Sequence, residues 1–254
     1  MLDKLSLIER IRHKIKNGKY SIGSWIQSPD PETAEIMAHS GYDWLAVDLE
    51  HGSISHHQLP NIFRAIELGG TLPIARVFDG SSVEIRRALD SGAGGVIIPN
   101  VTTSYQLDKS IDACRWPPNG TRGVGFCRAN VYGELFNEYQ TIANAPIIVA
   151  MIENKVALDE ISSIASTSAV DALFVGPYDL SASLGITGEF ENKLFADALK
   201  EIWAACERAN KPLGIHVVSP DTSELQRILS DGYQFVAYSI DTVFLRNGSK
   251  NPIQ

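Results

Sequence analysis

Short apolar runs recur along the chain, and segments with helical spacing lie between them. Residues 3–17 place Leu5, Ile8, Ile11 and Ile15 on one helical face with Lys and Arg between them, which predicts an amphipathic helix before the first strand. The apolar runs predict strands at Ser21–Ile26, Trp44–Val47, Leu72–Val77, Gly95–Pro99, Pro146–Glu153, Ala172–Gly176, Leu213–Val218 and Phe235–Ile240. Helices are predicted between them, at residues 31–40, 56–68, 82–91, 104–113, 156–165, 191–209 and 221–230.

Eight strands that alternate with helices predict an α/β fold, a closed parallel (β/α)8 or TIM barrel. The 254 residues match the size of one such barrel, and no Gly–Ser linker divides them, so we expect a single domain over residues 1–254. A doubly wound open sheet is the rival fold, but no Gly-x-Gly-x-x-Gly follows the first strand. The chain after the last strand, Asp241–Gln254, has room for one short C-terminal helix.

The composition narrows the class of partner. With 22 basic and 30 acidic residues the net charge is −8, which argues against nucleic acid and against an anionic membrane. An anionic substrate therefore needs local positive charge, from a metal ion or a placed arginine. Three cysteines without Cys-x-x-Cys spacing are typical of free thiols in a reducing compartment, and no signal peptide or membrane span precedes the barrel, so we expect a cytoplasmic protein.

Charged side chains stand where four of the predicted strands end. They are Asp48, Glu50 and His51 after the second strand, Arg76 in the third, Glu153 at the end of the fifth and Asp179 after the sixth. The carboxyl ends of barrel strands open on one face, so we expect these side chains to converge. Glu153 and Asp179 are hard oxygen donors on adjacent strands, and they suit Mg²⁺ or Mn²⁺ with water and substrate completing the coordination.

Each of these residues alone also has an ordinary structural explanation. Asp179 is explained as a helix N-cap, Glu153 as a cap or surface pair, and Arg76 as an ion pair across the barrel, for instance with Glu153. Asp90 lies at a predicted helix end, where an aspartate is usually structural. The loop Arg115–Gly133 is rich in Pro, Gly and Arg, which is typical of a functional loop at a barrel mouth and also of a plain surface loop. Their joint placement favours a site.

Several segments together resemble the HpcH/HpaI aldolase family, over about residues 20 to 246. They are Asp48-Leu-Glu-His-Gly, Pro73-Ile-Ala-Arg-Val, Leu89-Asp-Ser-Gly-Ala, Glu153-Asn-Lys and Gly176-Pro-Tyr-Asp-Leu-Ser. The resemblance implies a metal-dependent class II aldolase that cleaves 4-hydroxy-2-oxo acids or 2-keto-3-deoxy sugar acids to pyruvate and an aldehyde. It also implies a homo-oligomer, a hexamer in which the last helix packs on a neighbour.

The resemblance assigns roles to individual residues. It implies that Glu153 and Asp179 bind the metal, with Co²⁺ a third candidate ion, and that Arg76 binds the pyruvyl oxygen. His51, paired with Asp90, belongs to the acid–base apparatus, because a carboxylate partner orients an imidazole and raises its basicity. Gly176 and Pro177 fall in the substrate-binding motif, and backbone N–H groups around Gly176–Asp179 are candidates to hold the pyruvate carboxylate.

The chain departs from the family pattern at three positions that we include among the substrate-binding candidates. Tyr178 stands where a small residue is usual, and His216 stands at a position associated with an apolar side chain near the aldehyde. Arg128 lies in a segment that differs from the dicarboxylate-cleaving members, and with His216 it is a candidate for binding a polyhydroxy or acidic tail.

Three rival functions remain open. A Schiff-base aldolase needs a lysine inside the barrel, but Lys155 lies beyond the fifth strand and the sixth strand has none. A carbon–carbon lyase acting on CoA thioesters, as in the related citrate-lyase β subunits, has comparable metal carboxylates. The third rival is a non-catalytic protein that binds pyruvate or oxalate.

Overall fold

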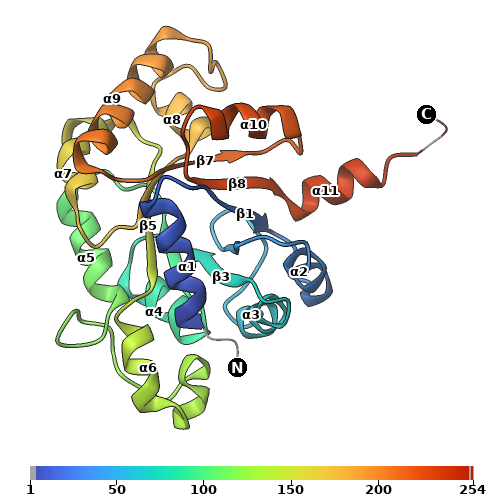
Figure 1. Ribbon diagram of the computed structural model, residues 1–254, viewed down its shortest axis with the longest axis vertical. Helices are drawn as coiled ribbons and strands as arrows, with labels where there is room; N and C mark the ends of the chain where they lie inside the picture. The colour runs from blue at the N-terminus through green and yellow to red at the C-terminus, as the bar shows by residue number, and fades with distance from the viewer. Residues whose placement is uncertain (1–3, 252, 254) are drawn as a thin grey trace.

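A computed structural model describes residues 4–251 and 253, and its eight strands form a closed parallel barrel in chain order (Figure 1). The strands are β1 (Ser21–Ile26), β2 (Trp44–Asp48), β3 (Leu72–Arg76), β4 (Gly95–Ile98), β5 (Ile147–Ile152), β6 (Ala172–Val175), β7 (Leu213–Val217) and β8 (Phe235–Ile240). Pairing of β1 with β8 closes the ring. The TIM-barrel prediction is confirmed, and each predicted strand ends within one residue of the observed one.

Helices surround the barrel. They are α1 (Lys4–Lys16), α2 (Pro31–Ala38), α3 (Leu59–Leu68), α4 (Ser82–Asp90), α5 (Ser104–Cys114), α6 (Phe136–Ala143), α7 (Ile161–Ser166), α8 (Pro177–Ser183), α9 (Lys193–Ala209), α10 (Thr222–Ser230) and α11 (Asp241–Gly248), with 3-10 helices η1 (Arg128–Gly133) and η2 (Lys155–Glu160). The predicted N-terminal and C-terminal helices are confirmed. The sequence did not predict α6 or η1, which lie in the long connection between β4 and β5.

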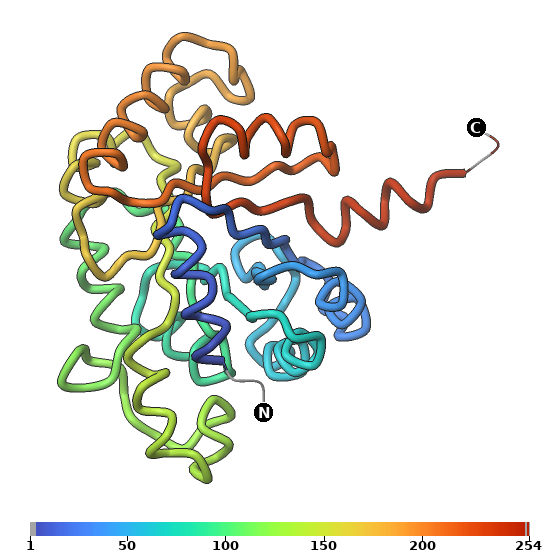
Figure 2. The backbone as a smooth tube through the Cα atoms, viewed as in Figure 1, coloured from blue at the N-terminus to red at the C-terminus, as the bar shows by residue number. Residues whose placement is uncertain are grey.

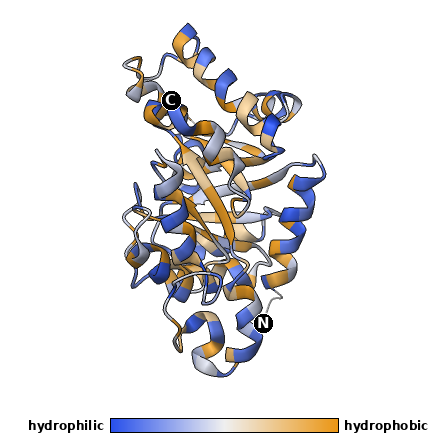
Figure 3. Cartoon of the chain, turned by 90° about the vertical axis from the view of Figure 1, so that its left-hand side faces the viewer, coloured by the Kyte–Doolittle hydropathy of each residue, from blue (hydrophilic) through white to orange (hydrophobic). Residues whose placement is uncertain are grey.

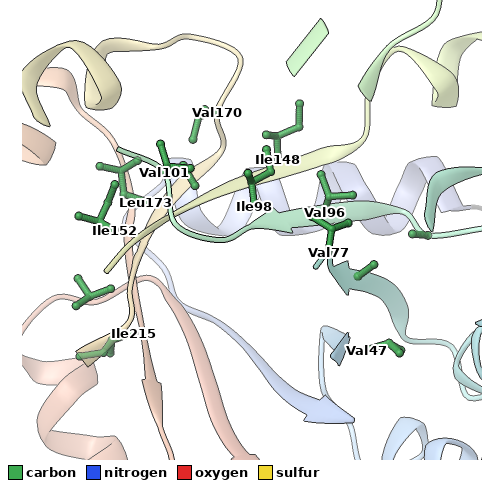
Figure 4. Close-up of a cluster of buried hydrophobic side chains, with 14 of the residues drawn as sticks. Val47, Val77, Val96, Ile98, Val101, Ile148, Ile152, Val170, Leu173 and Ile215 are labelled. Atoms are coloured by element: carbon green, nitrogen blue, oxygen red, sulfur yellow. The ribbon is translucent and has the colours of Figure 1, made fainter. Parts of the chain in front are cut away.

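The strands are apolar throughout because both of their faces are buried. Side chains on the outer face, among them Val96, Ile148 and Leu173, pack in the layer between barrel and helices (Figure 4). Figure 3 shows the apolar strands at the centre and helices with mixed polar and apolar positions around them. Side chains on the inner face form a second cluster that fills the barrel.

Two aromatic rings fill the lower part of the interior. The rings of Trp44 and Phe235 stack with centroids 4.3 Å apart and an interplanar angle of 3°. Gly23 on the neighbouring strand makes room for them, because a Cβ at this position would lie 2.1 Å from the Trp44 ring. The barrel is therefore a packed core, and only its mouth has space for a ligand.

Helix α1 closes the bottom of the barrel, at the N-terminal ends of the strands (Figure 2). Its buried Leu7, Ile8, Ile11 and Ile15 belong to the interior cluster. Arg12 fixes it there, since its Nε donates to Asp171 Oδ1 at 2.7 Å, directly before β6.

Helix α11 follows β8 directly and points away from the barrel (Figures 1 and 2). Asp241 at its start is buried, and its two carboxylate oxygens accept from the backbone N–H groups of Gln27 and Ser28 at 3.0 and 2.8 Å. Within the described residues, the helices are all too short or too polar to cross a membrane.

Candidate active site

The mouth of the barrel, at the C-terminal ends of the strands, contains a cavity of about 350 Å³. Its walls come from β1, β2, β3, β5, β6, β7 and β8 and from the start of α8. The side chains and backbone that line it include Trp25, Gln27, Asp48, His51, Arg76, Met151, Phe174, Gly176, Pro177, Tyr178, Asp179, His216 and Val218. Most of the residues predicted from the sequence are therefore gathered in one place.

Arg76 and Asp48 form a buried, bidentate ion pair on adjacent strands. The register of β2 and β3 sets Asp48 directly beside Arg76. Arg76 donates from Nε to Asp48 Oδ1 at 2.9 Å and from Nη2 to Asp48 Oδ2 at 2.6 Å. The predicted alternative, an ion pair of Arg76 with Glu153, is not formed.

Asp48 is a fully buried hydrogen-bond acceptor that also shapes the loop after β2. Its Oδ1 accepts from the backbone N–H groups of Glu50 and His51, each at 3.1 Å, and its Oδ2 accepts from Gln27 Nε2 at 2.9 Å. Burial opposes ionisation, but the hydrogen bonds and positive charge of Arg76, helped by Gln27, hold the pKa of Asp48 below its usual value. The sequence marked Asp48 as a strand-end carboxylate but not as the partner of Arg76.

Two further groups fix the arginine. The guanidinium carbon of Arg76 lies 4.6 Å from the centre of the Trp25 ring, in a cation–π contact. Arg76 Nη1 lies 3.2 Å from Glu50 Oε2, an ion pair without hydrogen-bond geometry. Burial first, and then the negative charges of Asp48 and Asp179, raise the pKa of Glu50 against the effect of Arg76. Arg76 is thus held rigidly, and its Nη1 makes no hydrogen bond to an oxygen of the described residues.

Glu153 follows β5 and is 6% exposed. Its Oε1 accepts from the backbone N–H of Asn100 at 2.6 Å, and Asn100 adopts a left-handed backbone with φ of 48°, which asparagine tolerates. Gly176 leaves room for the same carboxylate, because a Cβ there would lie 2.6 Å from Glu153 Oε2. Burial, with the charges of Glu50 and Asp179, raises the pKa of Glu153 to about 7.

Asp179 lies in the first turn of α8 and is exposed to the cavity. Its negative charge contributes to the raised pKa of both Glu153 and Glu50, so the three carboxylates share one environment. Among the described residues the Asp179 carboxylate accepts no hydrogen bond, although an aspartate that served only as an N-cap would accept one. Repelling carboxylates with spare oxygens are a donor set for a hard divalent cation.

The donor set fits an ion that uses few protein ligands. In the described part of the chain, no three His, Cys, Asp or Glu side chains gather closely enough to hold a metal by themselves. Mg²⁺ is commonly bound by one or two carboxylates, with substrate and water in the other positions. Glu153 and Asp179 match that pattern, and their role as metal ligands stays a prediction.

His51 lines the cavity, but Asp90 does not. His51 is exposed, and only its backbone N–H is fixed, by Asp48. Asp90 is the last residue of α4, and because the barrel helices run back toward the bottom, Asp90 lies there. Its Oδ1 accepts hydrogen bonds from Arg122 Nε and Nη2 at 3.2 and 2.8 Å. The expected His51–Asp90 pair is therefore not formed within the described chain, and the acid–base role of the two residues stays a prediction.

Arg128 also lies at the bottom of the barrel. It donates from Nη1 to the backbone oxygen of Ser91 at 2.9 Å and forms an ion pair with Glu67 at 2.5 Å. Lys4 of α1 pairs with the same glutamate at 2.9 Å. The hypothesis that Arg128 binds a substrate tail is therefore wrong for the cavity of its own chain.

His216 and Tyr178 do reach the cavity. His216 Nε2 lies 3.1 Å from the backbone oxygen of Ser239, and the His216 ring centre is 5.5 Å from that of Trp25. Burial lowers the pKa of His216 to about 4, so the ring is neutral at neutral pH. Tyr178 is 54% exposed at the rim. Gly176 and Pro177 line the same wall, while their role in holding a carboxylate stays a prediction.

Three supporting residues were not identified from the sequence. Trp25, Gln27 and Asn100 each follow or end an apolar strand, which is the one signal that marks them. Their function depends on which atom they present to Arg76, Asp48 or Glu153, and that is decided by register and backbone conformation. Lys155, the residue weighed for Schiff-base chemistry, is exposed and starts η2 outside the barrel.

Comparison with known proteins identifies the family. The family model described as HpcH/HpaI aldolase/citrate lyase matches residues 21–248. The chain is 38% identical to a 4-hydroxy-2-oxovalerate aldolase of Novosphingobium aromaticivorans, covering 95% of this chain and 92% of that one. It is 33% identical to a 2-keto-3-deoxy-L-rhamnonate aldolase of Escherichia coli O6:K15:H31, over 93% and 89% of the two chains.

A solved structure agrees with the sequence comparisons. The crystal structure of an HpcH/HpaI aldolase/citrate lyase family protein from Burkholderia cenocepacia J2315 superimposes with a TM-score of 0.88 and 31% identity, covering 96% of each chain. The resemblance predicted from the motifs is thereby confirmed. This chain belongs to the HpcH/HpaI aldolase/citrate lyase family.

Proposed function

We propose that this protein is a metal-dependent class II aldolase that reversibly cleaves a 4-hydroxy-2-oxo acid or 2-keto-3-deoxy sugar acid to pyruvate and an aldehyde. The supporting observation is the convergence, at one barrel mouth, of a fixed arginine with two carboxylates that have spare oxygens, Glu153 and Asp179. The names of the related aldolases agree with this class of carbon–carbon lyase.

Glu153 and Asp179 would hold the ion, with Mg²⁺ or Mn²⁺ preferred by their hard oxygen donors and Co²⁺ as a third candidate. A bound divalent cation supplies Lewis acidity and orients the 2-oxo acid. The backbone N–H of Asn100 orients the Glu153 carboxylate, and the missing side chain at Gly176 leaves its second oxygen accessible. The hydrogen bond from Asn100 and the space at Gly176 therefore keep the Glu153 carboxylate in place before a metal ion or a substrate binds.

Arg76 binds the C2 oxygen of the substrate in this proposal. Of its five N–H groups, two donate to Asp48, and those on Nη1 make no hydrogen bond within the described part of the chain. A guanidinium held by Asp48 and Trp25 does not need to reorganise when negative charge develops on that oxygen during cleavage. Preorganised donors of this kind contribute roughly 10²–10³ in kcat.

His51 is the proposed acid–base residue. It removes the proton of the C4 hydroxyl, directly or through a water molecule, as the C3–C4 bond breaks and the aldehyde forms. In the reverse direction it returns that proton to the new hydroxyl. The backbone N–H of His51 donates to Asp48, the ion-pair partner of Arg76, and His51 and Arg76 line the same cavity. An imidazole suits both directions because it can accept a proton in one and donate it in the other.

The test is a pyruvate-release assay on a panel of 4-hydroxy-2-oxo acids and 2-keto-3-deoxy sugar acids, with and without EDTA. Release should stop with EDTA and return with excess Mn²⁺ or Mg²⁺. The variants Glu153→Gln and Asp179→Asn should lose Mn²⁺ binding in calorimetry, while Asp159→Asn, an acidic residue outside the cavity, serves as the control.

Other results would support the rival functions. EDTA-insensitive cleavage with borohydride trapping of pyruvate would indicate a Schiff-base enzyme. Cleavage of a CoA thioester alone would indicate citrate-lyase-like chemistry. Tight binding of pyruvate or oxalate without turnover of any acceptor would indicate a binding protein.

We also infer a homo-oligomer, with a hexamer as the expected state. Helix α11 points away from its own barrel and carries Leu245, which is 72% exposed (Figure 1). Light scattering on the intact protein tests this. Leu245→Glu should reduce the mass, whereas Leu68→Glu, which changes a 68% exposed leucine at the end of α3, should not. A monomeric wild-type protein would refute the inference.

A further inference from the structure

A second and larger cavity, of about 460 Å³, lies between α9 and α10 and is called the α9–α10 groove here. Helix α9 contributes Phe195, Leu199 and Trp203, and Ile228 of α10 and Tyr233 complete its apolar walls. The ring centres of Trp203 and Tyr233 are 4.9 Å apart. Its size and aromatic lining are those of a small-molecule site.

The groove adjoins the active-site cavity, with which it shares four lining residues. Pro177, Tyr178, His216 and Val218 line both spaces. Tyr178, which directly precedes the proposed metal ligand Asp179, stands at the junction. From there a row of aromatic rings leads along the groove, because Tyr178 packs edge-on against Phe190 at 5.1 Å and Phe190 contacts Phe195 at 5.4 Å.

The charges of the two spaces differ. The active-site cavity carries its charged groups on the β2, β3 and α8 sides, whereas the wall toward β7 is formed by neutral His216 and Val218. Among the described groove residues Arg227 is the one lysine or arginine, and it already pairs with Asp231 at 3.1 Å. Glu191 and Glu224 add negative charge at the rim. An anionic ligand is therefore disfavoured in the groove.

We propose that the α9–α10 groove binds an uncharged, apolar chain on the aldehyde half of the substrate. The inference rests on the proposed function. Because the carboxylate and keto oxygens of the 2-oxo acid lie with Arg76 and the proposed metal ligands in this proposal, the chain beyond C4 leaves past Tyr178 and His216, where the uncharged β7 wall adjoins the groove. It then follows the aromatic rings into the groove.

The reaction to measure is aldol addition of pyruvate to aldehydes of increasing length. In each case a bond forms between C3 of pyruvate and the aldehyde carbon, and the C3 proton is formally transferred to the new hydroxyl. Burying one methylene corresponds to about fourfold in kcat/KM. We therefore expect kcat/KM to rise from acetaldehyde through butanal to hexanal, by at least about tenfold overall. Succinic semialdehyde, whose tail is anionic, should be a poorer acceptor than butanal.

A matched pair of variants locates the effect. Leu199→Trp fills the groove and should remove the preference for hexanal while acetaldehyde is still used. Leu194→Trp makes the same change on the same helix, at a 54% exposed position outside the groove, and should keep the preference. Retained acetaldehyde activity in both variants serves as the check on folding.

The outcomes separate the two proposals. A kcat/KM that is flat with chain length, a preference for the anionic aldehyde, or an unchanged preference in Leu199→Trp would overturn the groove assignment while leaving the aldolase intact. Absence of product with every aldehyde, together with absence of pyruvate release, would refute the proposed function and the groove assignment with it.

Discussion

Replacing Asp48 by Asn is expected to destabilise the protein and to misplace Arg76. The amide oxygen of the new side chain would retain the bonds from Arg76 Nε and from the backbone N–H groups of Glu50 and His51 that Asp48 Oδ1 now accepts. The amide NH₂ would replace Oδ2, which now accepts from Arg76 Nη2 and Gln27 Nε2. The new NH₂ donor would then face two N–H donors, and both of these hydrogen bonds would be lost. One charge-assisted bond contributes about 1.5–3 kcal/mol and a neutral one about 1 kcal/mol.

The expected loss in the free energy of unfolding is therefore about 3 kcal/mol at pH 7. This lies at the lower end of the range of about 3–5 kcal/mol for breaking a buried ion pair, because Glu50 remains as a counter-charge for Arg76. Denaturant unfolding of the EDTA-treated protein measures it as a change in midpoint at constant slope. Pyruvate release should fall roughly 10²–10³-fold, since Arg76 loses its orientation.

The pH dependence of the free energy of unfolding gives a second test of the Asp48–Arg76 ion pair. The pKa of Asp48 in the folded protein lies below its unfolded value, so its stabilisation is complete above the unfolded pKa of about 3.9 and is lost as the pH falls through the folded pKa. The difference in the free energy of unfolding between wild type and D48N should therefore become smaller in acid. D197N, which removes an exposed partner of Lys193, should unfold like wild type. Equal midpoints for D48N and D197N would refute the reasoning.

Single contacts give three further predictions. Gly176→Ala should weaken Mn²⁺ binding in calorimetry by about tenfold or more, because its Cβ displaces Glu153, while Gly123→Ala, with its nearest neighbour at 3.7 Å, should not. Between pH 6.5 and 4 the contribution of His216 to the free energy of unfolding should fall by up to about 3 kcal/mol, since the folded pKa of His216 is lowered to about 4 and the unfolded chain takes up the proton first; the difference in acid unfolding between wild type and His216→Leu measures it. Arg128→Ala should lower the melting temperature by breaking its contact with Glu67, yet leave the preference among substrates unchanged.

The barrel could be predicted because its strands are buried on both faces and are therefore apolar without interruption, as in Ile147–Ile152. The connection between β4 and β5 could not. Within η1, Val131 and Tyr132 adopt left-handed backbone with φ of 54° and 55°, which is unusual for a β-branched or aromatic residue and leaves no sequence pattern. Helix α6 buries only Tyr139 and Ala143 of its eight residues, so its periodicity is weak.

The candidate site could be predicted as a set of strand ends but not as a set of partners. Barrel topology brings Asp48, Arg76 and Asp179 together whatever the details, because all strands open on one face. The pairing of Arg76 with Asp48 depends on the register of β2 and β3, which composition does not encode. Neither the motif around Asp90 nor the loop around Arg128 indicates at which face of the barrel these side chains lie. Asp90 ends a helix, and a helix end lies at the opposite face from a strand end.

The two halves of the cavity come from different parts of the chain. The residues proposed for bond cleavage therefore lie on other strands than those proposed to select the aldehyde. Arg76 and the groups that hold it belong to β1, β2 and β3, and Glu153 follows β5. The neutral wall comes from β7, through His216, and Tyr178 of α8 stands beside it. A substitution at His216 removes no hydrogen bond from Asp48 or Glu153, so it should change the space proposed for the chain beyond C4 without moving the groups proposed to act on C2. Substitutions that change aldehyde preference among family members with this layout are therefore expected mainly on the β7 side, where they should reduce the catalytic rate least.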